Sequence, residues 1–141
     1  MAIPETVRKV VESGRLAHLV TLNRDGSPQV TCVWVGVEGD EIVVAHLAEH
    51  LKVKNVRRDG RVSFSIETDG VSPQGLNEYL IVHGNARITE GGAAELLQKL
   101  AYVYIGPGVK FLPMDNPAPG YVTHIRPTRY GGVGPWVGVK S

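Results

Sequence analysis

The densest group of charged side chains lies between residues 50 and 61. Five cations and one carboxylate give this segment a charge of +4, whereas the whole chain of 141 residues carries +1. The segment follows a strand-like run and begins a helix, where backbone N–H groups and the helix dipole favour a phosphate. We therefore expect an anion-binding site here, the alternative being a solvent-exposed helix face. The cations are Lys52, Lys54, Arg57, Arg58 and Arg61, and the carboxylate is Asp59.

A second candidate is the β-rich segment that begins at Pro28. Side chains alternate along a strand, so Gln29, Thr31 and Val33 share one face. Those polar groups could line a ligand, or the segment could be an ordinary amphipathic barrel strand. We expect Cys32, on the other face, to be a buried apolar residue rather than a nucleophile. The other residues of that second face are Val30 and Trp34.

The glycine-rich end of the chain is a third candidate. Four glycines or prolines lie between Arg129 and Trp136 and allow a close backbone approach to a ligand or a neighbouring subunit. No Asp or Glu follows Asp115, so the cations of this tail are unopposed in sequence. The tail could be ordered and functional, because a tryptophan so near the end needs a packing partner, or it could be a frayed terminus.

Other chemistries find little support. The motifs GxSxG, HExxH and GxxxxGK[ST] are absent, and His46 and His50 lack a nearby third metal ligand, so we expect no metal site. A single cysteine excludes a disulfide-stapled secreted scaffold. The chain has no apolar leader and no apolar run of about 18 residues. We expect a cytoplasmic protein that neither enters a membrane nor binds nucleic acid, since the aromatic residues do not interleave with the cations.

Many short elements must position these residues, because 17 glycines and 9 prolines favour tight turns. Periodicity predicts a mainly β chain with peripheral helices, in a single domain over residues 1–141. The first three strands are expected to form an antiparallel meander around the turn Asp25-Gly26. The expected strands are 16–22, 28–37, 41–47, 61–67, 78–89 and 121–127, and the expected helices are 5–12, 50–58 and 93–105.

Four of these features together resemble a known family. They are the Asp25-Gly26 turn, the run Pro28-Gln29-Val30-Thr31, the strand 42–46, and the pattern Lys-x-x-Asn-x-x-Arg-Asp that starts at Lys52. The sequence is similar over nearly its whole length to the flavin and deazaflavin oxidoreductases related to pyridoxamine 5′-phosphate oxidase. That resemblance implies a split β-barrel of the FMN-binding type, which forms a homodimer and binds its cofactor between the subunits.

Within that family the chain looks more like the branch that uses coenzyme F420, a deazaflavin. The oxidases have an arginine at the start of the second barrel strand, where this chain has Gln29 to Thr31, and their C-terminal substrate-binding pattern is absent. The resemblance implies hydride transfer from reduced F420 to an electron-poor C=C or C=O group of a small molecule. The alternatives are an FMN-dependent oxidoreductase of the same fold and a non-catalytic member that binds a cofactor or haem.

The resemblance also implies roles for particular residues. Lys52 would hold the cofactor phosphate, helped by His46 and Lys54, while Asn55 and Arg58 would support the loop or contact the phosphate and the polyglutamate tail. Gln29, Thr31 and Val33 would line the ring. No side chain is identified as catalytic, because solvent can supply the proton. The second subunit would contribute Tyr79 and the tail from Arg129 to Trp136.

Overall fold

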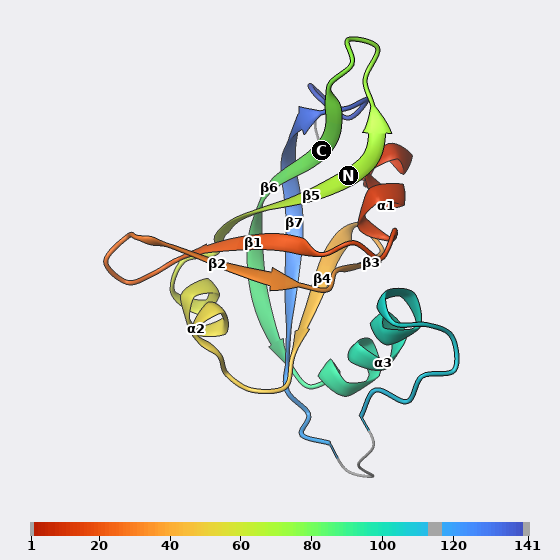
Figure 1. Ribbon diagram of the computed structural model, residues 1–141. Helices are drawn as coiled ribbons and strands as arrows, with labels where there is room; N and C mark the ends of the chain where they lie inside the picture. Colours follow the sequence, from red (N-terminus) through yellow and green to blue (C-terminus); the bar gives the residue numbers. More distant parts are fainter. Residues whose placement is uncertain (1, 113–116, 140–141) are drawn as a thin grey trace.

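Seven antiparallel strands form one sheet in the order β2-β1-β5-β6-β7-β4-β3 (Figure 1). The computed structural model describes residues 2–112 and 117–139. The mainly β class with peripheral helices is confirmed. The elements are α1 (Glu5–Val11), β1 (Ala17–Leu22), β2 (Pro28–Val33), β3 (Gly36–Glu38), β4 (Glu41–His46), α2 (Leu51–Arg58), β5 (Arg61–Val71), β6 (Asn77–Glu90), α3 (Ala93–Tyr104) and β7 (Tyr121–Val133).

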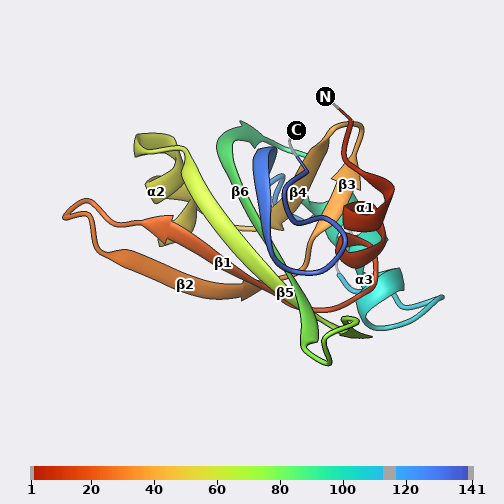
Figure 2. The same ribbon diagram turned by 90° about the horizontal axis from the view of Figure 1, so that it is seen from above.

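The two outermost strands of this sheet are neighbours in the chain. Only Trp34 and Val35 separate β2 from β3, although the other five strands lie between them in the sheet. The sheet must therefore curl until its two edges nearly meet, as the view from above shows (Figure 2). This arrangement is a barrel left open between β2 and β3, and it confirms the expected split β-barrel.

The expected three-strand meander is wrong. The turn at Asp25-Gly26 does join β1 to β2, with Gly26 at φ +87° and the Ser27 N–H donating to Asp25 Oδ1 at 3.0 Å. The segment 28–37, however, divides at Trp34 into β2, which pairs with β1, and β3, which pairs with β4. Alternation of side chains reports which face is buried but not which strand is the neighbour, so the sequence pattern could not reveal the change of partner.

The last strand is also longer than expected, because the glycine-rich run belongs to it. Strand β7 continues to Val133, and residues 129–133 pair with residues 79–83 of β6. A bulge at Thr128 separates this part from the predicted strand 121–127, and the Thr128 hydroxyl donates to the His83 carbonyl at 3.1 Å. Pro127 lacks an N–H for the ladder, so its position beside the bulge has a physical reason.

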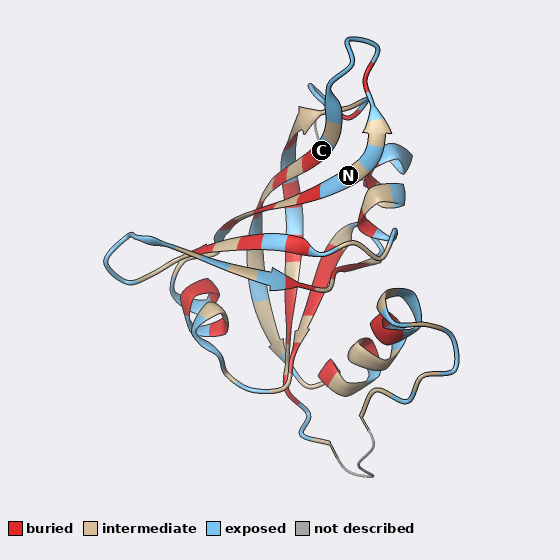
Figure 3. Cartoon of the chain, viewed as in Figure 1, coloured by how far each residue is buried: buried red, intermediate tan, exposed pale blue. Residues whose placement is uncertain are grey.

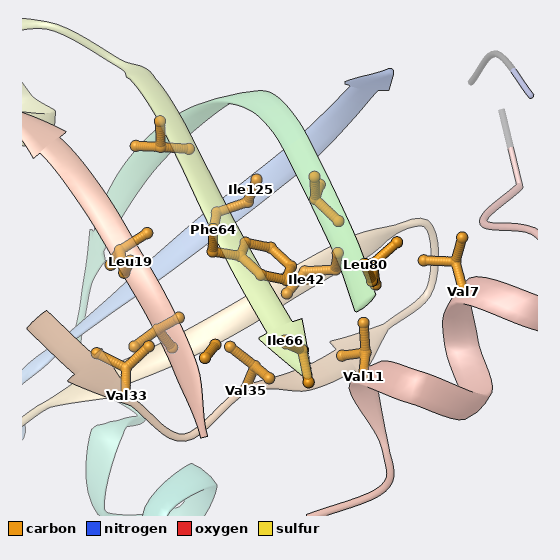
Figure 4. Close-up of a cluster of buried hydrophobic side chains, with 14 of the residues drawn as sticks. Val7, Val11, Leu19, Val33, Val35, Ile42, Phe64, Ile66, Leu80 and Ile125 are labelled. Atoms are coloured by element: carbon orange, nitrogen blue, oxygen red, sulfur yellow. The ribbon is translucent and has the colours of Figure 1, made fainter. Parts of the chain in front are cut away.

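Alternating apolar residues fill the barrel. In β5 the buried positions are Val62, Phe64 and Ile66, and the residues between them are less buried. Buried and less buried positions also alternate along other strands of the barrel (Figure 3). Helix α1 turns Val7 and Val11 towards this core and covers it on one side (Figure 4). Burying a side chain of this size contributes about 1.5–3 kcal/mol, so each of these positions favours the folded barrel.

Helices α2 and α3 are short amphipathic segments packed at the barrel's surface (Figure 1). Within residues 2–112 and 117–139, no helix combines the length and the apolar character needed to cross a membrane.

Candidate functional site

A pocket of about 340 Å³ opens between α2 and α3, beside the end of β4. Most of its walls are apolar, including Val33, Leu97 and Leu100. Its basic side chains are His46, His50 and Lys52, and none of the described residues that line it is an Asp or Glu. The pocket is therefore suited to a ligand that has an apolar body and an anionic group.

Lys52 lies in the first turn of α2, where a cation is electrostatically unfavourable. The helix forms because Val53 and Val56 are buried at helical spacing, yet its first turn has no acidic residue and no side-chain cap. The first N–H groups of a helix have no partner within the helix, and they add to the local positive potential. Burial also lowers the pKa of Lys52. An anion bound at this end of α2 would relieve each of these unfavourable terms.

His46 ends β4 and is only 3% exposed. Its Nε2 lies 2.8 Å from the hydroxyl of Thr123 on β7, the strand paired with β4. Burial lowers the pKa of His46 to about 4, and the charges of Lys52 and His50 lower it further in the same direction. The imidazole is therefore neutral at pH 7, and the fixed positive charge at the pocket comes from Lys52.

Asn55 and Arg58 connect α2 to the β1–β2 hairpin. The fully buried Asn55 amide donates to Asn23 Oδ1 at 2.9 Å and to Thr21 Oγ1 at 3.1 Å. Arg58 donates to Asn55 Oδ1 at 3.2 Å and to the carbonyl of Leu22. These hydrogen bonds suit the supporting role expected for this pair, because both side chains hold the helix that carries Lys52. Lys54 is exposed on α2 and does not line the pocket.

The alternation predicted for β2 agrees with the burial of its residues. Gln29, Thr31 and Val33 face inward, whereas Val30 is 61% exposed. Val33 reaches the pocket, Gln29 Oε1 accepts a hydrogen bond from Thr21, and the buried Thr31 Oγ1 has no hydrogen-bond partner in the described part of the chain. The expectation that Cys32 is buried is wrong: it is exposed and borders the pocket, on the outward face of the edge strand β2.

Of the expected cofactor residues, only Val33, His46 and Lys52 line this pocket within one copy of the described chain. The residues that do not line it are Gln29, Thr31, Lys54, Asn55, Arg58, Tyr79, Arg129 and Trp136. Tyr79 borders a depression between the ends of β5 and β6, and Arg129 borders another beside Arg61. Trp136 is 2% exposed in the barrel core, where its Nε1 donates to the Gly131 carbonyl at 2.9 Å. The tail from 129 to 136 is therefore ordered, and the alternative of a frayed terminus is wrong for these residues.

Sequence reasoning missed an aromatic group at the pocket. Trp34 stacks on Tyr104 of α3, with ring centroids 5.2 Å apart and planes 13° apart, and Phe111 lies 5.0 Å from Trp34. Trp34 and Phe111 both line the pocket. The apolar face of α3 was visible as helical periodicity, but the pattern did not show that this helix and the loop after it would reach β2.

A second missed feature is a polar pair on the outer face of the barrel. Ser63 Oγ lies 2.7 Å from His83 Nδ1, in a depression of about 470 Å³ that also contains Arg61 and Arg129. Burial, followed by the charge of Arg129, lowers the pKa of His83. Across the described ranges, no three His, Cys, Asp or Glu side chains gather closely enough to hold a metal ion.

Comparisons with solved structures place this geometry among similar barrels. An F420 reductase is 26% identical, covers 92% of this chain and 98% of its own, and has a TM-score of 0.72. A conserved hypothetical protein from Mycobacterium tuberculosis is also 26% identical, with coverages of 94% and 85% and a TM-score of 0.70. A heme binding protein from Mycobacterium smegmatis is 20% identical, with coverages of 95% and 56% and a TM-score of 0.65, and this likeness concerns the fold alone.

No curated protein matches the sequence. The sequence profile of the family described as pyridoxamine 5′-phosphate oxidase, by contrast, matches residues 3–120. That range includes all but the last strand, and within it lie the basic end of α2, the inward face of β2 and the pocket between α2 and α3. The chain therefore belongs to the split-barrel family of pyridoxamine 5′-phosphate oxidase.

Proposed function

We propose that the protein is a homodimeric reductase that uses reduced coenzyme F420 to transfer a hydride to an electron-poor C=C or C=O group of a small molecule. The observation that carries the proposal is Lys52, half-buried in the first turn of α2 at a mainly apolar pocket. A phosphate and a flat ring on one molecule match that combination. The likeness to an F420 reductase over 92% of this chain supports F420 as the cofactor.

The residues around the pocket fit such a cofactor. Its phosphate would lie against Lys52 and the first-turn N–H groups of α2, with His46 beside them. The exposed cations Lys54 and Arg58 would attract the carboxylates of the polyglutamate tail. As the family resemblance implies, the ring would lie beside Gln29, Thr31 and Val33 of β2, of which Val33 lines the pocket. The buried Thr31 hydroxyl has no hydrogen-bond partner among the described residues.

The chain's contribution to the reaction is to bind, orient and exclude water. When bound, reduced F420 supplies a hydride, so two electrons reach the acceptor carbon while the neighbouring acceptor atom takes a proton from solvent. Lys52 fixes the anionic end, and Leu97 and Leu100 keep the opposite wall dry. His46 stays neutral and adds no second charge. No side chain is assigned as the proton donor.

A second copy of the chain would complete the groove. The outer face of the β1–β2 hairpin carries Val30 opposite Val20 and Cys32 opposite His18, and Val30 is 61% exposed. Covering this face would remove apolar surface from water. The partner subunit would then supply Tyr79 and the Arg129 end of its β7 to the cofactor, as the family resemblance implies.

Fluorescence titration of the purified protein with F420 and, separately, with FMN tests the cofactor. We expect wild type to bind F420 saturably. Lys52→Ala should weaken F420 binding about 10-fold or more, because a charge-assisted hydrogen bond is lost. Lys52→Arg should largely retain the affinity for F420, because it keeps the positive charge. Lys99→Ala, an exposed change on α3, serves as the control. Saturable micromolar FMN binding with none for F420 would reverse the assignment in favour of an FMN-dependent oxidoreductase, which the family match also supports.

A further inference from the structure

The aromatic side chains at the pocket are positioned by ring stacking and hydrogen bonds as well as by apolar packing. Trp34 follows β2 directly, at the point where the chain crosses to β3, and its ring lies flat on Tyr104. The Tyr104 hydroxyl accepts the Val35 N–H at 2.9 Å and donates to the Arg15 carbonyl at 2.9 Å. Both hydrogen bonds are to backbone, so the phenol ring is fixed, and the stacked indole is fixed with it.

Phe111 is held in another way, through side-chain hydrogen bonds to the backbone of its loop. The side-chain amide of Gln98 on α3 reaches the loop after the helix, where its Nε2 donates to the Val109 carbonyl and its Oε1 accepts the Phe111 N–H at 3.0 Å. One amide thus provides both a donor and an acceptor to the loop backbone. A backbone hydrogen bond within this loop, from the Val109 N–H to the Gly106 carbonyl, is long at 3.4 Å. Gln98 therefore fixes the segment that carries Phe111.

The two rings form a corner of the pocket. Their centroids are 5.0 Å apart and their planes meet at 58°, and both rings line the pocket. Leu97 and Leu100 continue this corner along α3, while Lys52 lies on the α2 side of the same pocket. One pocket therefore holds an anion-binding end and a separate aromatic end.

The chemistry of the corner selects a particular class of molecule. An indole face is electron-rich, so it stacks best on a flat ring system that is poor in electrons. A compact aliphatic molecule would touch the corner without using its flatness. We propose that Trp34 and Phe111 form the acceptor-binding end of the pocket, that they favour a planar, conjugated, electron-poor acceptor over a compact aliphatic one, and that Gln98 and Tyr104 position them. This inference rests on the proposed reductase function for the acceptor's role in turnover.

Binding without cofactor gives the first test. The chain has two tryptophans, and Trp136 is buried in the core, so a naphthoquinone that binds at the corner quenches mainly Trp34. We expect saturable quenching that is lost in Trp34→Phe and whose dissociation constant rises about 3- to 10-fold in Phe111→Leu. Quenching that never saturates, or that is the same in wild type and Phe111→Leu, would overturn the proposal.

Turnover with reduced F420 gives the second test. Phe111→Leu should lower kcat/KM for the naphthoquinone about 3- to 10-fold and change that for cyclohexenone, a compact aliphatic acceptor, less than about 2-fold. Its dissociation constant for F420 should stay unchanged. An equal loss with both acceptors, or a matching loss of F420 affinity, would contradict an acceptor site and assign the rings to the cofactor instead.

The positioning role of Gln98 has its own control. Gln98→Met keeps the length of the side chain but removes both hydrogen bonds, so KM for the naphthoquinone should rise while kcat and the F420 dissociation constant hold. Lys99→Met makes the same replacement at the adjacent exposed position and should behave as wild type. If Gln98→Met leaves KM unchanged, Gln98 does not position Phe111. Should F420 fail to bind while the quinone still quenches Trp34, the proposed cofactor is wrong and the aromatic site stands.

Discussion

His46 shows how one side chain can make stability depend on pH. It is buried between β4 and β7, with a pKa of about 4 in the folded chain and an ordinary value of 6.5 when exposed. Between those values the unfolded chain binds more protons than the folded one, so the free energy of unfolding must fall as pH falls from about 6.5 to 4. Above that window the contribution is complete, because both states are neutral.

We predict that wild type loses up to about 3 kcal/mol of stability through His46 over that window. His46→Gln, which cannot titrate, should show a flatter dependence, with a remaining slope of the same sign from His83, whose pKa is also lowered. Urea unfolding at pH 7, 6, 5 and 4.5 measures both curves. Parallel curves for the two proteins would show that His46 does not carry the effect.

At the scale of the element, helix α2 and the β1–β2 hairpin behave as one unit. Asn55 and Arg58 of the helix bond to Asn23, Thr21 and Leu22 of the hairpin. Lys52 on that helix and the inward face of β2 are the two parts of the candidate site that this network holds in register. We therefore expect the motif residue Asn55 to contribute to ligand binding through position rather than through contact.

Replacing Asn55 should disturb both stability and binding. We expect Asn55→Ala to cost about 2 kcal/mol in the free energy of unfolding, because buried polar groups lose their partner, and to weaken F420 binding although Lys52 is untouched. Lys54→Ala, at the adjacent exposed position, should cost less than about 0.5 kcal/mol. Urea unfolding at pH 7 and the fluorescence titration measure the two effects. Equal stability of the two variants would refute the supporting role.

Local patterns in the sequence predicted the helices and strands better than they predicted which strands pair with one another. Periodicity identified the three helices and the inward residues of β2, and the pattern at Lys52 identified the basic end of α2. These local patterns could not show that β4 pairs with β7, because that pairing joins His46 to Tyr121 across about half of the chain. The sequence did not predict the aromatic corner for the same reason: Trp34 and Phe111 come into contact only when α3 packs against the barrel.

At the scale of the whole molecule, charge and apolar surface are unevenly distributed. The net charge of +1 conceals the +4 segment at α2, and the exposed valine of β2 lies on the outer face of an edge hairpin. A groove between two copies would use both features. Helix α2 would bind the anionic part of the cofactor, and the outer face of the β1–β2 hairpin would pack against the partner subunit. The proposed dimer is thus part of the proposed binding site.

Disrupting that face should separate the subunits. We predict that wild type elutes as a dimer in size-exclusion chromatography with light scattering, and that Val30→Lys shifts it towards the monomer and weakens F420 binding. Val103→Lys places the same charge on α3, at a valine that is 51% exposed, and should remain dimeric. If wild type is monomeric, or if Val30→Lys remains dimeric, the outer face of the β1–β2 hairpin is not the subunit interface.

The strand order has a further consequence for the time course of folding. Strand β7 lies between β6 and β4, so β3 and β4 cannot join the rest of the sheet until residues 121–133 are available. Contacts of such long sequence separation form late and slow the search for the native state. During synthesis, residues 36–46 must therefore wait until residues 121–133 have emerged. The pocket, which depends on the end of β4, comes into existence only with the barrel's final closure.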